Sequence, residues 1–209
     1  MLFTRQFKQF DDHIYHSPNF FLPPFPGRSI ATFHDMSVYR YPEYHQAAQV
    51  ALMEKEIPTA LGLADQIIAI SEFTKQEIMD ITGFPGDKIS VVYNGVSEEF
   101  HPRTEDELKR KLAKYDLKPK HYYLSLATIE PRKNIDTILD AYLKLPGRIR
   151  KHFPLVIGGA PGWKSGTIHE RIQKLSSNGE VRYLGYLPEQ DIPILYAGAA
   201  AKIFIPVYE

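Results

Sequence analysis

The sequence contains no cysteine among its 209 residues, and its 25 basic residues are balanced by 25 acidic ones. Without cysteine there is no disulfide framework, no thiolate metal site and no cysteine nucleophile. Without an excess of either charge there is no overall field to hold nucleic acid, so we expect no nucleic-acid partner. No apolar run approaches the roughly 18 residues that span a bilayer. We therefore expect a cytoplasmic protein.

Short apolar runs alternate with helical stretches in the first half of the chain. Runs rich in isoleucine, valine, phenylalanine and tyrosine predict strands at residues 12–16, 29–33, 66–70 and 89–93. Helices are predicted at residues 44–63 and 72–82, the second with Ser71 as its N-cap and Gly83 after its end. This alternation favours a parallel sheet.

The second half repeats the alternation after a charged, helix-like segment at residues 105–115. Strands are predicted at residues 122–127, 155–158, 181–184 and 202–206, and helices at residues 134–145, 167–176 and 189–197. We place a domain boundary near Pro102, which gives α/β domains at residues 1–102 and 103–209, and four strands rather than six suggest an incomplete sheet in the second. Doubly wound sheets bind ligands at the carboxyl ends of their strands, which directs attention to the loops 128–133, 159–166 and 185–188.

The loop that begins at Thr128 places Arg132 and Lys133 just before a predicted helix at Asn134. Unpaired N–H groups and the helix dipole favour an anion such as a diphosphate at that position. The spacing alone leaves open the alternative of a solvated turn with ordinary surface charges.

The segment at residues 158–165, GGAPGWKS, is superficially like a phosphate-binding P-loop. That motif requires glycine directly before lysine, and Trp163 stands there instead. The glycines rather predict a flexible loop between strand and helix, in which Trp163 packs locally or stacks on a ligand.

Four further polar residues lie at or near the ends of predicted strands, and two of them, His34 and Glu209, are candidates for chemistry. His34 follows a predicted strand, where an imidazole could bind substrate or move a proton, although a structural role is the alternative. His13 and His16 are three residues apart, which puts them on opposite faces of a strand, and we expect both to be structural. Glu209 follows the strand predicted at residues 202–206, where a carboxylate lining a cleft would lie.

Five segments occur together in the order of a known family: YHSPN at residues 15–19 with ATFHD at 31–35, IAISEFT at 68–74, VVYNGV at 91–96, EPRKN at 130–134 and IPVYE at 205–209. Over nearly its whole length the chain resembles the retaining nucleotide-sugar glycosyltransferases of group 1, the GT-B type that includes many bacterial mannosyltransferases. The resemblance implies two Rossmann-like parallel-sheet domains facing a cleft, with the first on the acceptor side and the second binding the nucleotide sugar.

The same resemblance implies roles for single residues. Lys133 would bind the donor diphosphate, with Arg132 and Asn134 beside it, and His34 would contact the transferred sugar. His34, Lys133 and Glu209 would form the catalytic set, and the backbone of three residues would hold the nucleobase: Gly185, Tyr186 and Leu187. Many members carry arginine five residues before the lysine, where Thr128 stands here, so diphosphate binding would lean more on Lys133.

Both ends of the chain depart from the family pattern. Family members begin with a strand and a glycine-rich loop ahead of the segments matched here. They also continue beyond the position of Glu209 to a second glutamate, which binds the donor ribose. We therefore expect a fragment in which both domains are incomplete.

The implied reaction transfers a hexose to a hydroxyl of a glycan or glycolipid acceptor, with retention, in polysaccharide or lipopolysaccharide biosynthesis. We expect GDP-mannose as the donor and mannose as the transferred sugar, while UDP- and dTDP-sugars are alternative donors. No cofactor and no metal are implied. Peripheral contact with the cytoplasmic face of a membrane stays open for the full-length enzyme. Two alternatives are a non-catalytic nucleotide-binding or subunit-interaction half of a split or decayed enzyme, and a sugar-nucleotide epimerase that frees UDP without an acceptor.

Overall fold

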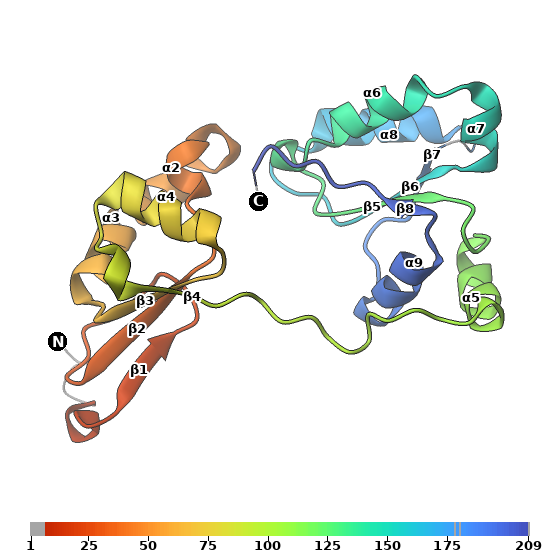
Figure 1. The fold of residues 1–209 in the computed structure, drawn as a ribbon. Helices are drawn as coiled ribbons and strands as arrows, with labels where there is room; N and C mark the ends of the chain where they lie inside the picture. Colours follow the sequence, from red (N-terminus) through yellow and green to blue (C-terminus); the bar gives the residue numbers. More distant parts are fainter. Residues whose placement is uncertain (1–6, 178, 180, 209) are drawn as a thin grey trace. The chain divides into compact units, whose positions relative to one another are not determined.

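The computed structural model describes residues 7–177, 179 and 181–208 of the chain. Two compact units are present, and the division falls between Gly95 and Val96. Each unit contains one four-stranded sheet, and helices accompany both sheets (Figure 1). The α/β class with two parallel-sheet domains is thereby confirmed.

The sheet of the first unit has the strand order β1-β2-β3-β4, and every neighbouring pair is parallel. Its strands are β1 Ile14–Ser17, β2 Arg28–Phe33, β3 Gln66–Ala69 and β4 Ile89–Val91. All four predicted strands of this half are confirmed, with ends that differ by one or two residues. The parallel arrangement brings the four carboxyl ends to one edge.

The described residues of the first unit form the α-helices α2 Ser37–Arg40, α3 Ala47–Leu63 and α4 Glu72–Thr82, with short 3-10 helices at Lys8–Phe10, Pro42–Tyr44 and Gly86–Lys88. Helix α4 begins and ends as predicted: the Ser71 hydroxyl accepts the Thr74 N–H at 3.0 Å, and Gly83 has a left-handed φ of 69°. The helix predicted at residues 44–63 begins only at Ala47, because extended backbone at His45 separates it from the 3-10 helix.

The sheet of the second unit has the order β7-β6-β5-β8, again with parallel pairs only. Its strands are β5 Tyr123–Leu126, β6 Leu155–Gly158, β7 Val181–Tyr183 and β8 Ala201–Lys202. The strand predicted at residues 202–206 is therefore wrong in extent. The backbone beyond β8 turns instead to the loop before α6, where the Val207 N–H donates to the Arg132 carbonyl at 2.9 Å.

The helices of the second unit are α5 Glu105–Leu112, α6 Ile135–Leu143, α7 Gly147–His152, α8 Gly166–Ser176 and α9 Ile192–Gly198, with 3-10 helices at Ala113–Tyr115, Pro131–Lys133 and Glu189–Asp191. Helix α7 was not predicted from the sequence. In the part of the chain that the structure describes, no helix combines the length and apolar character needed to cross a membrane.

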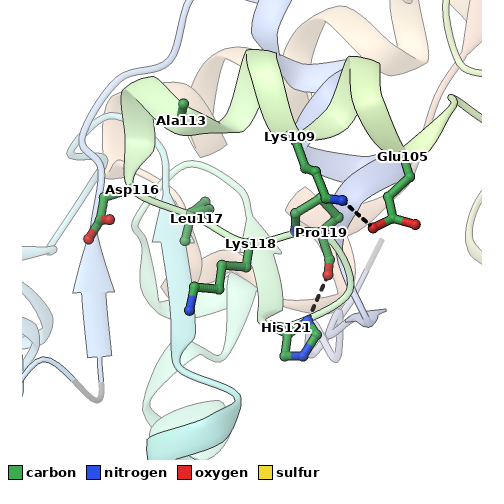
Figure 2. A pocket seen from close by; sticks show the side chains of 8 residues that line it. All are labelled: Glu105, Lys109, Ala113, Asp116, Leu117, Lys118, Pro119 and His121. Carbon is green, nitrogen blue, oxygen red and sulfur yellow. Dashed lines mark hydrogen bonds and ion pairs between the residues drawn. The ribbon is translucent and has the colours of Figure 1, made fainter.

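A groove of about 490 Å³ lies beside α5 (Figure 2). Its walls come from α5 and from the segment that leads into β5: Glu105, Lys109, Ala113, Asp116, Leu117, Lys118, Pro119 and His121. Lys109 pairs with Glu105 at 2.7 Å, and Nδ1 of His121 lies 2.7 Å from the Pro119 carbonyl oxygen. Because these residues precede β5, the groove lies at the amino end of that strand, away from the predicted ligand loops.

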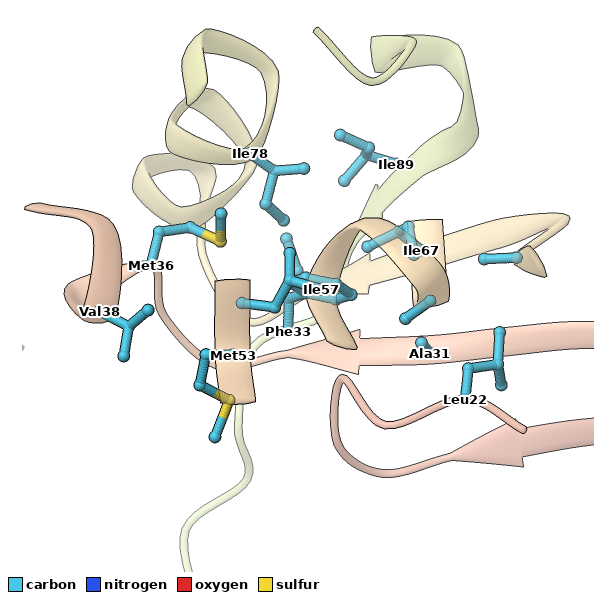
Figure 3. Close-up of a cluster of buried hydrophobic side chains, with 13 residues drawn as sticks. Leu22, Ala31, Phe33, Met36, Val38, Met53, Ile57, Ile67, Ile78 and Ile89 are labelled. Atoms are coloured by element: carbon cyan, nitrogen blue, oxygen red, sulfur yellow. The ribbon is translucent and has the colours of Figure 1, made fainter. Parts of the chain in front are cut away.

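One apolar cluster holds the first unit together (Figure 3). Phe33 of β2, Ile67 of β3 and Ile78 of α4 are fully buried there, and α3 adds Met53 and Ile57. Burial of side chains of this size is the main force that fixes these helices against the sheet. The carboxyl ends of β2 and β3 are thereby rigidly placed.

The second unit has an apolar cluster on each face of its sheet. Val156 of β6 packs with residues of α5 and α9, whereas its neighbours Leu155 and Ile157 pack with residues of α6 and α8. Successive strand residues point to opposite faces, so helices cover both sides of this sheet. This doubly wound arrangement leaves the strand ends as the place for ligands.

Candidate functional site

Three loops lie at the carboxyl end of the second sheet and are joined by backbone hydrogen bonds. The Ile129 N–H donates to the Ala160 carbonyl, and the Gly162 N–H donates to the Ile129 carbonyl, each at 2.9 Å. The Gly159 N–H donates to the Gly185 carbonyl at 2.8 Å. The loops predicted at residues 128–133, 159–166 and 185–188 are therefore brought together.

Two glycines permit this close approach. Gly159 has a φ of 146°, and a Cβ on it would lie 1.8 Å from the Ala127 carbonyl oxygen. A Cβ on Gly162 would lie 2.6 Å from Cγ2 of Thr128. A side chain at either position would push the middle loop away from the first.

The first loop carries the residues predicted to bind a diphosphate. Residues Pro131–Lys133 form a 3-10 helix, Asn134 is left-handed with a φ of 56°, and α6 begins one residue later than predicted, at Ile135. The Asn134 side chain donates to the Ile205 carbonyl at 3.1 Å and accepts the Thr137 hydroxyl at 2.6 Å. Asn134 therefore joins α6 to the segment after β8.

The two cations of this loop have different surroundings. Arg132 donates to the Tyr208 carbonyl at 3.0 Å and pairs with Glu130 at 3.2 Å. Lys133 is 9% exposed, and its ammonium lies 5.8 Å from the centre of the Phe204 ring. Arg132 thus holds the segment after β8 and has a carboxylate partner, while Lys133 is a buried cation at the strand ends.

The third loop presents backbone and one exposed ring. Gly185 has a left-handed φ of 68°, Tyr186 is 78% exposed, and the Leu187 side chain is buried. Below them, the Tyr183 hydroxyl donates to the Gly159 carbonyl at 2.7 Å, and burial raises the pKa of this tyrosine. The predicted nucleobase segment is therefore held to the core by the buried Leu187 side chain, while the Tyr186 ring is exposed to solvent.

Trp163 and Lys164 lie in the second loop, directly after Gly162. Trp163 is 39% exposed, and the Lys164 ammonium lies 5.7 Å from the centre of its ring. Lys164 has a left-handed φ of 51°, which is uncommon for a residue other than glycine. The sequence singles out Lys164 only as part of the rejected P-loop, although this lysine also lies in one of the three predicted ligand loops.

In the first unit, His34 lies directly after β2, as predicted. Its Nε2 is 2.9 Å from the Pro18 carbonyl oxygen, its own carbonyl accepts the Thr74 hydroxyl at 3.3 Å, and its side chain is exposed. His16 lies at the end of β1 with Nε2 2.8 Å from the Thr32 hydroxyl. The carboxyl edge of this sheet therefore carries imidazoles and hydroxyl groups.

Glu209, the third member of the predicted catalytic set, lies outside the described residues. Over the described ranges, no group of three or more histidine, cysteine, aspartate or glutamate residues is arranged to hold a metal ion.

Family models match both halves of the chain. The model described as Glycosyltransferase Family 4 matches residues 2–100, and the model described as Glycosyl transferases group 1 matches residues 104–209.

Among curated proteins, the O-antigen chain mannosyltransferase B of Escherichia coli is 38% identical over 202 residues, which is 97% of this chain and 53% of that protein. The chain thus spans about half the length of this relative.

Two solved structures are similar in fold. Anabaena HepE, in complex with UDP and glucose, superposes with a TM-score of 0.69 at 17% identity, over 86% of this chain and 46% of that one. WaaG, described as a glycosyltransferase involved in lipopolysaccharide biosynthesis, gives a TM-score of 0.66 at 11% identity, over 87% of this chain and 54% of that one. At these identities the likeness concerns the fold alone.

Proposed function

The chain belongs to the group 1 glycosyltransferases, and from this premise we propose that its second unit binds a nucleoside-diphosphate sugar at the three joined loops. The reaction is transfer of a hexose to a hydroxyl of a glycan or glycolipid acceptor, with retention at the anomeric carbon. The donor that we propose is GDP-mannose, because the curated relative with 38% identity is a mannosyltransferase.

The observation that carries the proposal is the position of Lys133. Its side chain is 9% exposed and lies in the loop that leads into α6, whose first N–H groups have no partner within the helix. An ammonium that is held away from water interacts more strongly with an anion than a solvated surface lysine does. This combination suits a diphosphate and supports the role that the sequence implies for Lys133.

Catalysis by this site would be mainly electrostatic. When the bond between the anomeric carbon and the diphosphate oxygen breaks, the electron pair stays with the diphosphate and its negative charge grows. Lys133 and the amino end of α6 would stabilise that charge more in the transition state than in the bound donor. His34, at the end of β2, would contact the transferred sugar, and the backbone at Gly185, Tyr186 and Leu187 would hold the base.

Calorimetric titration of the chain with GDP, UDP and GDP-mannose tests the proposal. We expect saturable binding of GDP and GDP-mannose. Replacing Lys133 with alanine should weaken that binding by on the order of tenfold or more, since a hydrogen bond to a charged group is worth about 1.5–3 kcal/mol. Lys174→Ala, a change of an exposed α8 lysine, is the matched control and should leave binding unchanged.

The outcomes separate the candidate functions. Binding of UDP in preference to GDP would support the proposed nucleotide site and contradict GDP-mannose as the donor. Binding of nucleotide without transfer of labelled mannose to any polymannose acceptor would favour the non-catalytic alternative. Equal affinities of Lys133→Ala and the unmodified chain would contradict the assignment of Lys133.

A further inference from the structure

We propose that Lys164 provides a second positive charge to the donor diphosphate, an inference that rests on the proposed function. The class of ligand is the pyrophosphate group of a nucleoside diphosphate. Lys164 comes from the second loop, whereas Lys133 comes from the first.

The position of Lys164 follows from the bonds between the two loops. Ile129 and Pro161 form a parallel bridge, and the Gly162 N–H donates to the Ile129 carbonyl at 2.9 Å. Gly162 also lies directly against Thr128, so Lys164 is two residues from a point of contact with the proposed diphosphate loop.

The charges of the residues in the three loops also point to Lys164. Thr128 is uncharged, and the guanidinium of Arg132 is 3.2 Å from the Glu130 carboxylate. Lys164 is exposed, and in the described residues no carboxylate lies within ion-pair distance of it. Among the described residues, its ammonium is thus a cation of this edge whose charge no neighbouring carboxylate offsets.

The local geometry restricts where this ammonium can go. The left-handed φ of 51° at Lys164 costs free energy, and such residues occur preferentially at ligand sites. The Trp163 ring, 5.7 Å from the ammonium, attracts the charge and reduces its freedom. A partly ordered cation loses less entropy when it binds a phosphate oxygen than a freely moving one does.

The test is titration of the full chain and of Lys164→Met with whichever of GDP and UDP binds, and with the matching monophosphate. Methionine keeps most of the side-chain length and removes the charge. We expect diphosphate affinity to fall about tenfold and monophosphate affinity to fall less, because the proposed contact is with the pyrophosphate group. Lys174→Met is the matched control, and thermal melting shows whether each variant is folded.

A double-mutant cycle with Trp163→Leu distinguishes a ligand role from a structural one. The tryptophan change should weaken diphosphate binding in the unmodified chain and have no further effect in Lys164→Met. Unchanged diphosphate affinity in folded Lys164→Met, together with lost affinity in Lys133→Ala, would overturn this inference and leave the proposed function intact. A folded chain that binds neither nucleotide would overturn both.

Discussion

Asp191 shows how single polar contacts hold the second unit in shape. Its carboxylate accepts hydrogen bonds from the Lys114 ammonium and the Tyr115 hydroxyl, each at 2.6 Å, and it is 8% exposed. Burial is the largest single influence and would raise the pKa of Asp191, but these two hydrogen bonds together with the positive charges of Lys114 and Lys111 outweigh it, and the pKa lies below its usual value. Burial and the bond to Asp191 in turn raise the pKa of Tyr115 to about 12.

We expect Asp191→Asn to lower the free energy of unfolding by about 1–2 kcal/mol at pH 7, a figure kept small because Lys114 is half exposed. A carboxyl with a lowered pKa in the folded state stabilises the fold above its unfolded pKa of about 4, and this stabilisation is lost as the pH falls through the folded pKa. Urea unfolding from pH 8 to pH 3 checks this. The difference between the proteins should stay constant down to about pH 5 and shrink below about pH 4. A difference that grows on acidification would contradict the ion pair.

At the scale of elements, the end of α9 depends on a residue from a distant segment. The Lys120 N–H donates to the Gly198 carbonyl, and its ammonium donates to the Ala197 carbonyl at 2.7 Å and the Ala199 carbonyl at 3.3 Å. The last carbonyl groups of a helix have no partner within it and attract a cation. Lys120 therefore caps the carboxyl end of α9, the helix that packs against α5.

Replacing Lys120 with methionine should destabilise the chain by about 1 kcal/mol, since it removes the charged donor of the Ala197 and Ala199 carbonyls and keeps only the backbone bond to Gly198. Lys118→Met is the matched control: Lys118 is also exposed and lies two residues earlier, at the groove of Figure 2. Urea unfolding of both variants measures the difference. The same midpoint for both would show that the capping contacts contribute nothing.

The elements also show what sequence patterns can predict here. Long apolar or amphipathic stretches with clear end signals were found, as α4 with Ser71 and Gly83 illustrates. Helices α2 and α7 were missed because four and six residues are too few to show a period of 3.6. The strand predicted at residues 202–206 was too long because the Ile205 carbonyl accepts the Asn134 side chain, a partner far away in the sequence.

The candidate site was predictable to a similar degree. The rule that ligands bind at the carboxyl ends of parallel strands predicted the three loops, which the structure brings together, and the position of His34 after β2, while the roles of these residues stay predictions. The pairing of Arg132 with Glu130, and the left-handed backbone of Lys164, depend on side-chain packing and local strain that spacing does not encode. Those two features distinguish the cations of this edge from one another.

At the scale of the whole molecule, each unit has its own sheet and its own apolar clusters. A unit with a separate core can fold alone. All three joined loops, Lys133 and Lys164 belong to the unit that begins at Val96. The proposed nucleotide contacts are therefore independent of the first unit, whereas the proposed sugar contact of His34 is not.

This division predicts the behaviour of a chain made of residues 96–209. It should unfold cooperatively, because it contains its own core. It should also bind the same nucleoside diphosphate as the full chain, because all proposed nucleotide contacts lie in this unit, and the two affinities should agree within about threefold, or about 0.7 kcal/mol. The full chain, in contrast, should bind GDP-mannose more tightly than GDP only if His34 contacts the sugar, so His34→Ala should remove that difference and leave GDP binding unchanged. Calorimetry on the three proteins tests both parts. A folded 96–209 chain that has lost nucleotide binding would show that the first unit contributes to the diphosphate or base contacts, and the site would then have to be assigned to both units.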